Sequence, residues 1–235
     1  MKRTTRPTPP ASSAGRFAQA LASRGLNTRR VSQSTLILAQ PIVAGNSTYT
    51  FPVLQNQAPV LPNEIRLSLQ DLFEVTTMAV GFSGTLRVPG PPVVGPFRRN
   101  FFAPLANFDV AFLPLYPLYQ GTLKAVLNEV TYLLNWDLSR HLSEGTTQTQ
   151  TAAAGVGATF TEVEGNKTGF FPVNPGIVLN GQAKNDFTIQ MPTNQLAPIP
   201  FTQFTTQTGG IIEINIDQII LVMRGNLAQN ASGNN

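Results

Sequence analysis

Few residues in this chain have side chains that could carry out covalent chemistry. His141 is the only histidine among 235 residues, and cysteine does not occur. A Ser–His nucleophile system would depend on His141, while a thiolate nucleophile or a thiolate metal site cannot form. The sequence also lacks a G-x-S-x-G elbow and a Walker phosphate-binding loop. We therefore predict no enzymatic activity, no catalytic residue, no metal site and no cofactor, and we place His141 in an exposed loop.

The closest acidic pair in the sequence is Glu162 and Glu164. On a β-strand this spacing would bring both carboxylates to one face, where they could help to bind a cation at a boundary between subunits. The other acidic residues are scattered along the chain. We therefore favour a solvated pair.

The charges near the N-terminus all have the same sign. The first 63 residues contain seven basic residues and no acidic residue, whereas the remaining 172 contain nine basic and twelve acidic residues. A basic segment of this kind is typical of contact with a polyanion, such as nucleic acid, an anionic membrane or an acidic neighbouring subunit, although a solvated tail has the same composition. The candidate contact residues are Lys2, Arg3, Arg6, Arg16, Arg24, Arg29 and Arg30.

A second candidate surface is the segment 89–121, which combines seven prolines with seven aromatic residues. We predict a long excursion without regular sheet, whose aromatic side chains are covered by another subunit. The arginines of this segment beside aromatic rings also allow a contact with single-stranded nucleic acid. The candidate residues are Phe97, Arg98, Arg99, Phe101, Phe102, Phe108, Phe112, Tyr116 and Tyr119.

The elements that position these residues are predicted to be strands. Alternation of apolar and polar residues favours β-structure through residues 31–225, and the break at Gln218 indicates a bulge in the last strand. One short helix is predicted at 13–26, packed on the underside of the body or on another subunit, and 226–235 form a polar tail. The predicted strands cover residues 36–43, 48–54, 64–70, 73–80, 85–88, 123–136, 158–163, 168–173, 186–191 and 210–223, and an exposed polar loop covers 143–158. For 123–136 a helix is the less favoured alternative, because Leu123, Val126, Leu127 and Val130 keep helical spacing.

The composition indicates what kind of surface encloses this body. Charged residues make up only 12% of the chain, about half of the usual share of roughly 25%. A polar but weakly charged surface suits a protein that packs against copies of itself. The N-terminus has no apolar stretch typical of a secretory signal, and no 18 consecutive apolar residues occur, so neither a signal peptide nor a transmembrane helix is predicted.

A basic arm at 1–30 followed by a cysteine-free sandwich rich in Thr, Asn, Gln and Pro resembles the jelly-roll coat proteins of small icosahedral viruses and tailless bacteriophages. The resemblance implies an all-β jelly-roll β-sandwich. An echo of Phe51-Pro52-Val53 in Phe171-Pro172-Val173 leaves a double jelly roll as the less favoured alternative.

The resemblance also implies a function and partners. It implies a capsid subunit located in the virion, which assembles with its own copies and with other capsid proteins. The arm would then contact neighbouring subunits, viral nucleic acid or an internal membrane, although seven positive charges are few for packaging RNA. The alternatives are another virion component, such as a vertex or penton, tail or receptor-binding sandwich, and a nucleic-acid-binding module.

Overall fold

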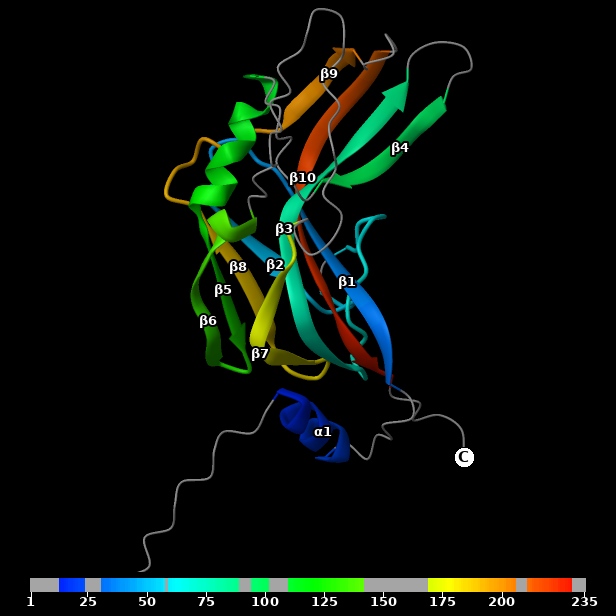
Figure 1. Cartoon of the computed structure of the whole chain (residues 1–235), viewed down its shortest axis with the longest axis vertical. Coiled ribbons are helices and arrows are strands. Elements are labelled where there is room, and N and C mark those ends of the chain that lie inside the picture. Colours follow the sequence, from blue (N-terminus) through cyan, green and yellow to red (C-terminus); the bar gives the residue numbers. More distant parts are fainter. Residues whose placement is uncertain are drawn as a thin grey trace, which may run out of the picture.

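A computed structural model describes residues 13–23, 31–57, 59–88, 94–101, 110–141, 169–205 and 211–229. In these ranges the chain forms ten β-strands in two antiparallel sheets, which pack into a sandwich with one α-helix beneath it (Figure 1). Several residues and segments named above lie outside the described ranges: Lys2, Arg3, Arg6, Arg24, Arg29, Arg30, Phe102, Phe108, Glu162 and Glu164, the loop 143–158 and the strand predicted at 158–163.

The elements follow one another with few helices. In chain order they are α1 (Ser13–Ser23), β1 (Val31–Pro41), β2 (Thr48–Pro52), β3 (Leu72–Val88), β4 (Val94–Phe101), η2 (Val110–Gln120), β5 (Thr122–Leu127), β6 (Val130–Asp137), η3 (Leu138–His141), β7 (Phe171–Asn180), β8 (Asn185–Gln190), β9 (Ile199–Thr205) and β10 (Ile211–Ala228). Here η2 and η3 are 3-10 helices. In the described part of the chain, no helix is long and apolar enough to cross a membrane.

The strand pairing confirms an all-β sandwich. One sheet has the order β1-β10-β3-β4, with β7 also pairing with β3 and β9 with β10, and the other has the order β2-β8-β5-β6. When β4 and β9 are set aside, the remaining eight strands pair in a nested order: β1 with β10, β2 with β8, β3 with β7, and β5 with β6. The described residues form one two-sheet sandwich and not the two that a double jelly roll requires.

The two longest strands, β3 and β10, run through the whole molecule. At the lower end in Figure 1 they are flanked by β7 and β1, and at the upper end by β4 and β9. The upper end therefore extends beyond the second sheet. We call it the blade, which comprises residues 82–88, 94–101, 199–205 and 211–217.

The β3–β10 ladder shifts register twice, and a glycine lies at each shift. One shift falls between Ile216 and Gln218, where the sequence predicts a bulge, and the other between Arg224 and Gly225. A Cβ atom on Gly84 would lie 1.9 Å from the carbonyl oxygen of Asn215, and one on Gly225 would lie 1.7 Å from that of Glu74. Only glycine allows the two backbones to approach this closely.

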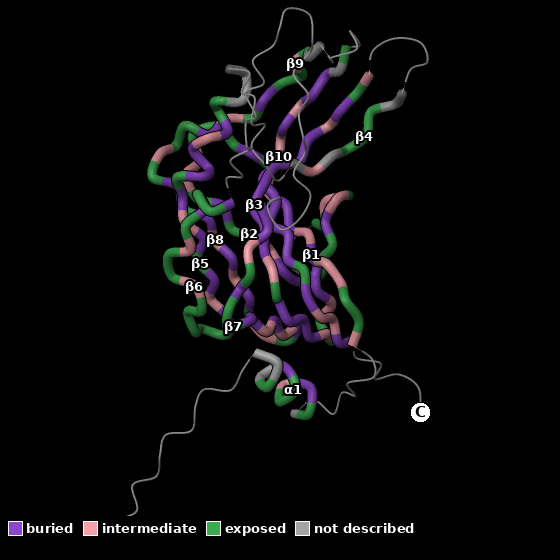
Figure 2. The backbone as a smooth tube through the Cα atoms, in the orientation of Figure 1, coloured by how far each residue is buried: buried purple, intermediate pink, exposed green. Residues whose placement is uncertain are grey.

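The core lies between the two sheets, and buried residues gather along the strands that face it (Figure 2). Its largest fully buried side chains include Phe51, Phe73 and Phe187. The 3-10 helix η2 adds to this core, because Leu118 and Tyr119 are buried, and the Tyr119 ring meets Phe82 edge to face at 5.9 Å. The segment 89–121 is therefore not the irregular excursion that the prolines suggest, since it contains both β4 and a core-packed helix.

The strand predicted at 64–70 is wrong. This stretch is a connection between β2 and β3, and it forms only isolated bridges with β1 and with Leu54. Its burial departs from the expected alternation: Leu67 is buried, but Ile65 and Leu69 are 51% and 41% exposed, while the side chains of Glu64 and Arg66 are 0% and 2% exposed. Charged side chains can be buried here because they form an ion pair of 2.6 Å.

Glu64 and Arg66 hold this connection against the free edge of β1. The Glu64 carboxylate accepts the backbone N–H groups of Ala39 and Leu61 at 2.9 and 2.7 Å. Arg66 donates to the carbonyl oxygens of Gln57 and Pro59. The pair thus satisfies backbone groups that the irregular loop would otherwise bury without partners.

Other boundaries also differ from the predictions. The strand predicted at 123–136 is a hairpin, because Asn128 and Glu129 have φ values of 48° and 67° and form a two-residue turn between β5 and β6. The strands predicted at 73–80 and 85–88 are one strand, β3. The last strand, β10, continues to Ala228, so the first residues of the predicted polar tail belong to the sheet.

Helix α1 packs beneath the lower end of the sandwich (Figure 1). Phe17 and Leu21 lie one turn apart on the same helix face and are 6% and 2% exposed. They pack with Leu72 of β3 and Ala228 of β10 in a small apolar cluster. Of the two surfaces that the sequence allows for this helix, the structure places it on the underside of its own body.

Gly225→Ala should destabilise the protein strongly, because the added methyl group would collide with the backbone of Glu74. We expect a loss of at least about 4 kcal/mol in the free energy of unfolding, measured by urea denaturation. Gly45→Ala is the control. Gly45 has a φ of +83° but open space around it, so its replacement costs only backbone strain of about 1–2 kcal/mol. Equal losses in the two variants would contradict this role of Gly225.

Glu64→Gln should cost about 3–5 kcal/mol of unfolding free energy, because it leaves the buried Arg66 guanidinium without its counter-charge. The matched control is Asp186→Asn in the Lys184–Asp186 pair, whose side chains are 72% and 32% exposed, and there we expect less than about 1 kcal/mol. Thermal or urea unfolding of both variants measures the difference. A small loss for Glu64→Gln would show that the buried pair does not hold the connection in place.

Candidate assembly surface

The nine residues predicted to form an inter-subunit surface have different positions. Phe97 and Arg98 lie on β4 in the blade, and Phe97 is 45% exposed. The backbones of Arg99 and Phe101 belong to β4 and that of Phe112 to η2, but their side chains lie outside what the structure describes. Tyr116 is half-buried. Tyr119 is buried, so its assignment to a surface is wrong. Burial also raises the pKa of its hydroxyl.

A network on one face of the blade joins β3, β10 and β9. The Glu213 carboxylate accepts a hydrogen bond from Gln203 at 2.8 Å and is paired with the Arg87 guanidinium. Both contacts lower the pKa of the Glu213 carboxyl, and the hydrogen bond from Gln203 has the larger effect. The Arg87 guanidinium also lies 4.1 Å above the ring of Phe201, a cation–π contact. The network therefore fixes β9 to the two long strands.

A second ion pair fixes β4 at the other edge of the blade, on the same face. Both terminal nitrogens of Arg98 donate to the two carboxylate oxygens of Asp217, each at 2.9 Å. This bidentate geometry is the strongest form of Arg–carboxylate contact. Asp217 lies within the register shift of β10, so the bulge turns its carboxylate toward the neighbouring strands.

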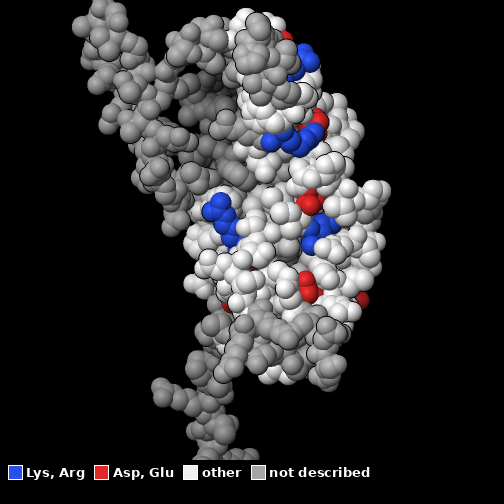
Figure 3. Space-filling model, turned by 90° about the vertical axis from the view of Figure 1, so that its right-hand side faces the viewer, with Lys and Arg blue, Asp and Glu red and all other residues white. Residues whose placement is uncertain are grey.

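One face of the blade consequently presents apolar side chains among described charges that are already paired. Phe201 and Ile211 lie on this face and are each 44% exposed, whereas Phe97 pairs with Leu86 and lies on the opposite face. On the side of the molecule that Figure 3 shows, charged side chains are sparse among uncharged ones. Exposed aromatic residues and arginines are enriched at protein–protein interfaces, and paired charges lower the cost of removing water from them. The blade can therefore form a contact with another protein surface.

The sequence only partly indicates this surface. Alternation of Ile212, Ile214 and Ile216 with Glu213, Asn215 and Asp217 predicts a polar face for the start of β10. The partners Arg87, Gln203 and Phe201 carry no local signal, because they are brought together only by strand pairing across distant segments. Of the basic arm, only Arg16 lies within a described element, α1, and its side chain is not described.

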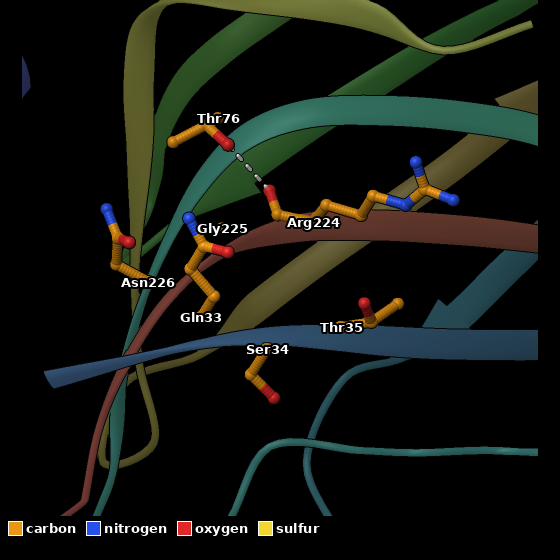
Figure 4. Close-up of a pocket in the computed structure, with 7 residues that line it drawn as sticks. All are labelled: Gln33, Ser34, Thr35, Thr76, Arg224, Gly225 and Asn226. Carbon is orange, nitrogen blue, oxygen red and sulfur yellow. Dashed lines mark hydrogen bonds between the residues drawn. The ribbon is translucent and has the colours of Figure 1, made fainter. Parts of the chain in front are cut away.

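A polar depression of about 460 Å³ lies on the outer face of the first sheet, at the lower register shift (Figure 4). Of its seven described lining residues, Arg224 alone is charged; its side chain extends away from Asn226 and stacks on the Phe170 ring at 3.8 Å. Thr76 donates its hydroxyl to the Arg224 carbonyl oxygen at 3.1 Å. Within the described ranges, no three His, Cys, Asp or Glu side chains are close enough together to hold a metal ion. The depression therefore offers weaker support for a site than the blade does.

The single histidine is buried, so its predicted place in an exposed loop is wrong. His141 is 0% exposed at the end of η3. Its Nε2 accepts the indole N–H of Trp136 at 2.9 Å, and its Nδ1 lies 2.8 Å from the carbonyl oxygen of Gly169. Because Nε2 accepts and Nδ1 donates, the ring is neutral. Burial lowers the pKa of His141 to about 4.

The stability of the protein should fall as the pH is lowered from 6.5 to 4, because the unfolded chain binds a proton at His141 that the folded chain excludes. A folded pKa of about 4 against an ordinary 6.5 corresponds to about 3 kcal/mol. His141→Gln retains an acceptor and a donor but does not titrate. The difference in unfolding free energy between wild type and this variant, measured by urea denaturation at several pH values, should change by that amount. Parallel pH curves would contradict the prediction.

No family model matches the chain, and comparisons with curated proteins and with solved structures find no match either. The function has therefore to be inferred from the chain's own strand pairing and surfaces.

Proposed function

We propose that this chain is a jelly-roll coat subunit of an icosahedral virus or tailless bacteriophage. The observation that carries the proposal is the nested pairing of eight strands, in which the first pairs with the last, the second with the seventh, the third with the sixth and the fourth with the fifth. A long antiparallel ribbon has these four pairings. Curling the ribbon on itself adds the β3–β10 and β5–β8 pairings, and viral capsid domains use jelly rolls of eight strands.

The surface of the body supports a role in assembly. The blade is an addition to the eight strands, and it projects beyond the second sheet with Phe201 and Ile211 exposed on one face and Phe97 on the other. On the first face, the charged side chains that the structure describes are engaged in the pairs Arg87–Glu213 and Arg98–Asp217. A second copy can cover such a surface without leaving charges buried and unpaired.

The position of the basic arm also fits a coat subunit. Helix α1 begins at Ser13 and lies beneath the sandwich, at the opposite end from the blade (Figure 1). The arm therefore joins the body at the end away from the blade. We propose that its basic residues contact neighbouring subunits, the genome or an internal membrane from this end. Because seven charges are few for neutralising packaged RNA, a strap between subunits or a contact with anionic lipid is favoured.

The purified full chain should assemble into large closed particles, visible by light scattering and negative-stain electron microscopy. Ile211→Asp should raise the protein concentration needed for assembly about tenfold or more, because it places an unpaired charge on the face that carries Phe201 and the paired charges. Val60→Asp is the matched control, since Val60 is 47% exposed on the connection between β2 and β3.

A strictly monomeric wild-type chain at high concentration and across a range of salt would overturn the proposed function. Equal effects of the two substitutions would retain assembly but would exclude the blade as its surface.

A further inference from the structure

Among the described strands, prolines occur in the edge strands and not in the central ones. The central strands β3, β5, β8 and β10 contain no proline, whereas five of the six edge strands contain at least one. Proline cannot donate a ladder hydrogen bond, so it discourages the addition of a further strand. The edge prolines are Pro41 in β1, Pro52 in β2, Pro96 in β4, Pro172 and Pro175 in β7, and Pro200 in β9.

The exception is β6, the edge strand of the second sheet (Figure 1). It contains neither proline nor a basic residue, and no described strand pairs with its side facing away from β5. Val130, Tyr132 and Leu134 are 56%, 47% and 63% exposed. An apolar, unprotected edge of this kind is the most favourable place on a sheet for a contact with another chain.

The shape of β6 makes its side chains project. Its eight residues lie opposite only six residues of β5, with register shifts beside Ala125. The extra residues are bulged, which bends the strand and turns Tyr132 and Leu134 toward solvent. Nothing comparable occurs in the β2–β8 ladder at the opposite edge of the sheet, where Thr48–Pro52 pairs in continuous register.

The sequence of β6 indicates which partner would fit. Residues 130–136 read Val-Thr-Tyr-Leu-Leu-Asn-Trp, so the order of apolar and polar residues is the same in both directions about Leu133. In an antiparallel pair of identical strands, Tyr132 of one would lie opposite Leu134 of the other, and Thr131 opposite Asn135. Such a contact is self-complementary about a twofold axis, as required of an isologous dimer.

The charges at the two ends agree with this arrangement. Glu129 precedes β6, and the exposed Arg140 follows it, with its guanidinium 4.1 Å above the Trp136 ring. Antiparallel pairing brings the Glu129 end of one copy to the Arg140 end of the other. Asp137 lies at the same end as Arg140, and its carboxylate accepts hydrogen bonds from the N–H and hydroxyl of Ser139.

We propose that β6 is a contact between two copies of this chain, which lie antiparallel about a twofold axis near Leu133. The inference rests on the proposed self-association of the chain and names one of its interfaces. This interface is separate from the blade, which belongs to the other sheet.

The absence of cysteine allows a direct test. Leu134→Cys places one thiol per chain near the axis, where diagonal cross-strand neighbours are about 7–8 Å apart, within reach of a short bismaleimide. We expect crosslinked dimers from this variant at least fivefold more abundant than from Val43→Cys, a control residue that is 54% exposed in the β1–β2 connection. Equal crosslinking of both variants would overturn the proposal.

A second measurement removes the contact. Tyr132→Asp combined with Leu134→Asp should weaken dimerisation at least tenfold in sedimentation equilibrium, with an unchanged circular dichroism spectrum because both side chains are exposed. An unchanged dimer would overturn self-pairing. Self-pairing would also be overturned if Leu134→Cys crosslinked preferentially to Thr5→Cys on another copy, and the occupant of the β6 edge would then be the basic arm. Shell formation is read separately by microscopy, so dimers without shells would contradict only the coat function, and shells without the β6 crosslink only this inference.

Discussion

The close approach of β3 and β10 is the constraint on which the rest of the structure depends. Of the strands that the structure describes, only these two are shared by the sandwich and the blade, and each pairs with three other strands. Their ladder shifts register twice, which allows a long and twisted pair to serve both ends of the molecule. Gly84 and Gly225 make the shifts possible, because any side chain there would overlap a carbonyl group of the facing strand. Two backbone contacts therefore determine where the blade stands relative to the core.

Ion pairs fix the remaining parts of the chain to the two long strands and to each other. The described residues form four such pairs, of which Glu64–Arg66 is buried and Lys184–Asp186 is exposed. The buried pair organises the β2–β3 connection over the edge of β1, and the blade pairs hold β9 and β4 on the long strands. Because each pair joins neighbouring parts of one chain, it stiffens the surface without adding net charge. The outcome is a body whose surface is mostly polar and neutral, with its strong positive charge confined to the arm.

The local pattern of apolar and polar residues predicts much of the sheet, but it does not predict which charged or polar side chains are buried. The alternation around Ile214 and the break at Gln218 predict β10 and its bulge, because period and phase are encoded in neighbouring residues. The same reasoning fails for Glu64 and Arg66, which are charged and buried, since each is stabilised by partners that fold back from elsewhere in the connection. It fails likewise for His141, whose partners Trp136 and Gly169 satisfy both ring nitrogens. Periodicity reports which residues share a face, but not what covers that face.

The prolines of the edge strands matter because electrostatic repulsion between two bodies is weak. Residues 64–235 carry nine basic and twelve acidic side chains, so two bodies repel each other little when they approach. A sandwich with a neutral surface, whose described strands include six at sheet edges, would then associate in many ways. Proline in five edge strands, together with the loop over β1, limits hydrogen-bonded strand addition and leaves association to surfaces whose shape and side chains must match. A self-assembling subunit needs this restriction more than a monomer does, because a closed shell requires that few of the possible contacts form.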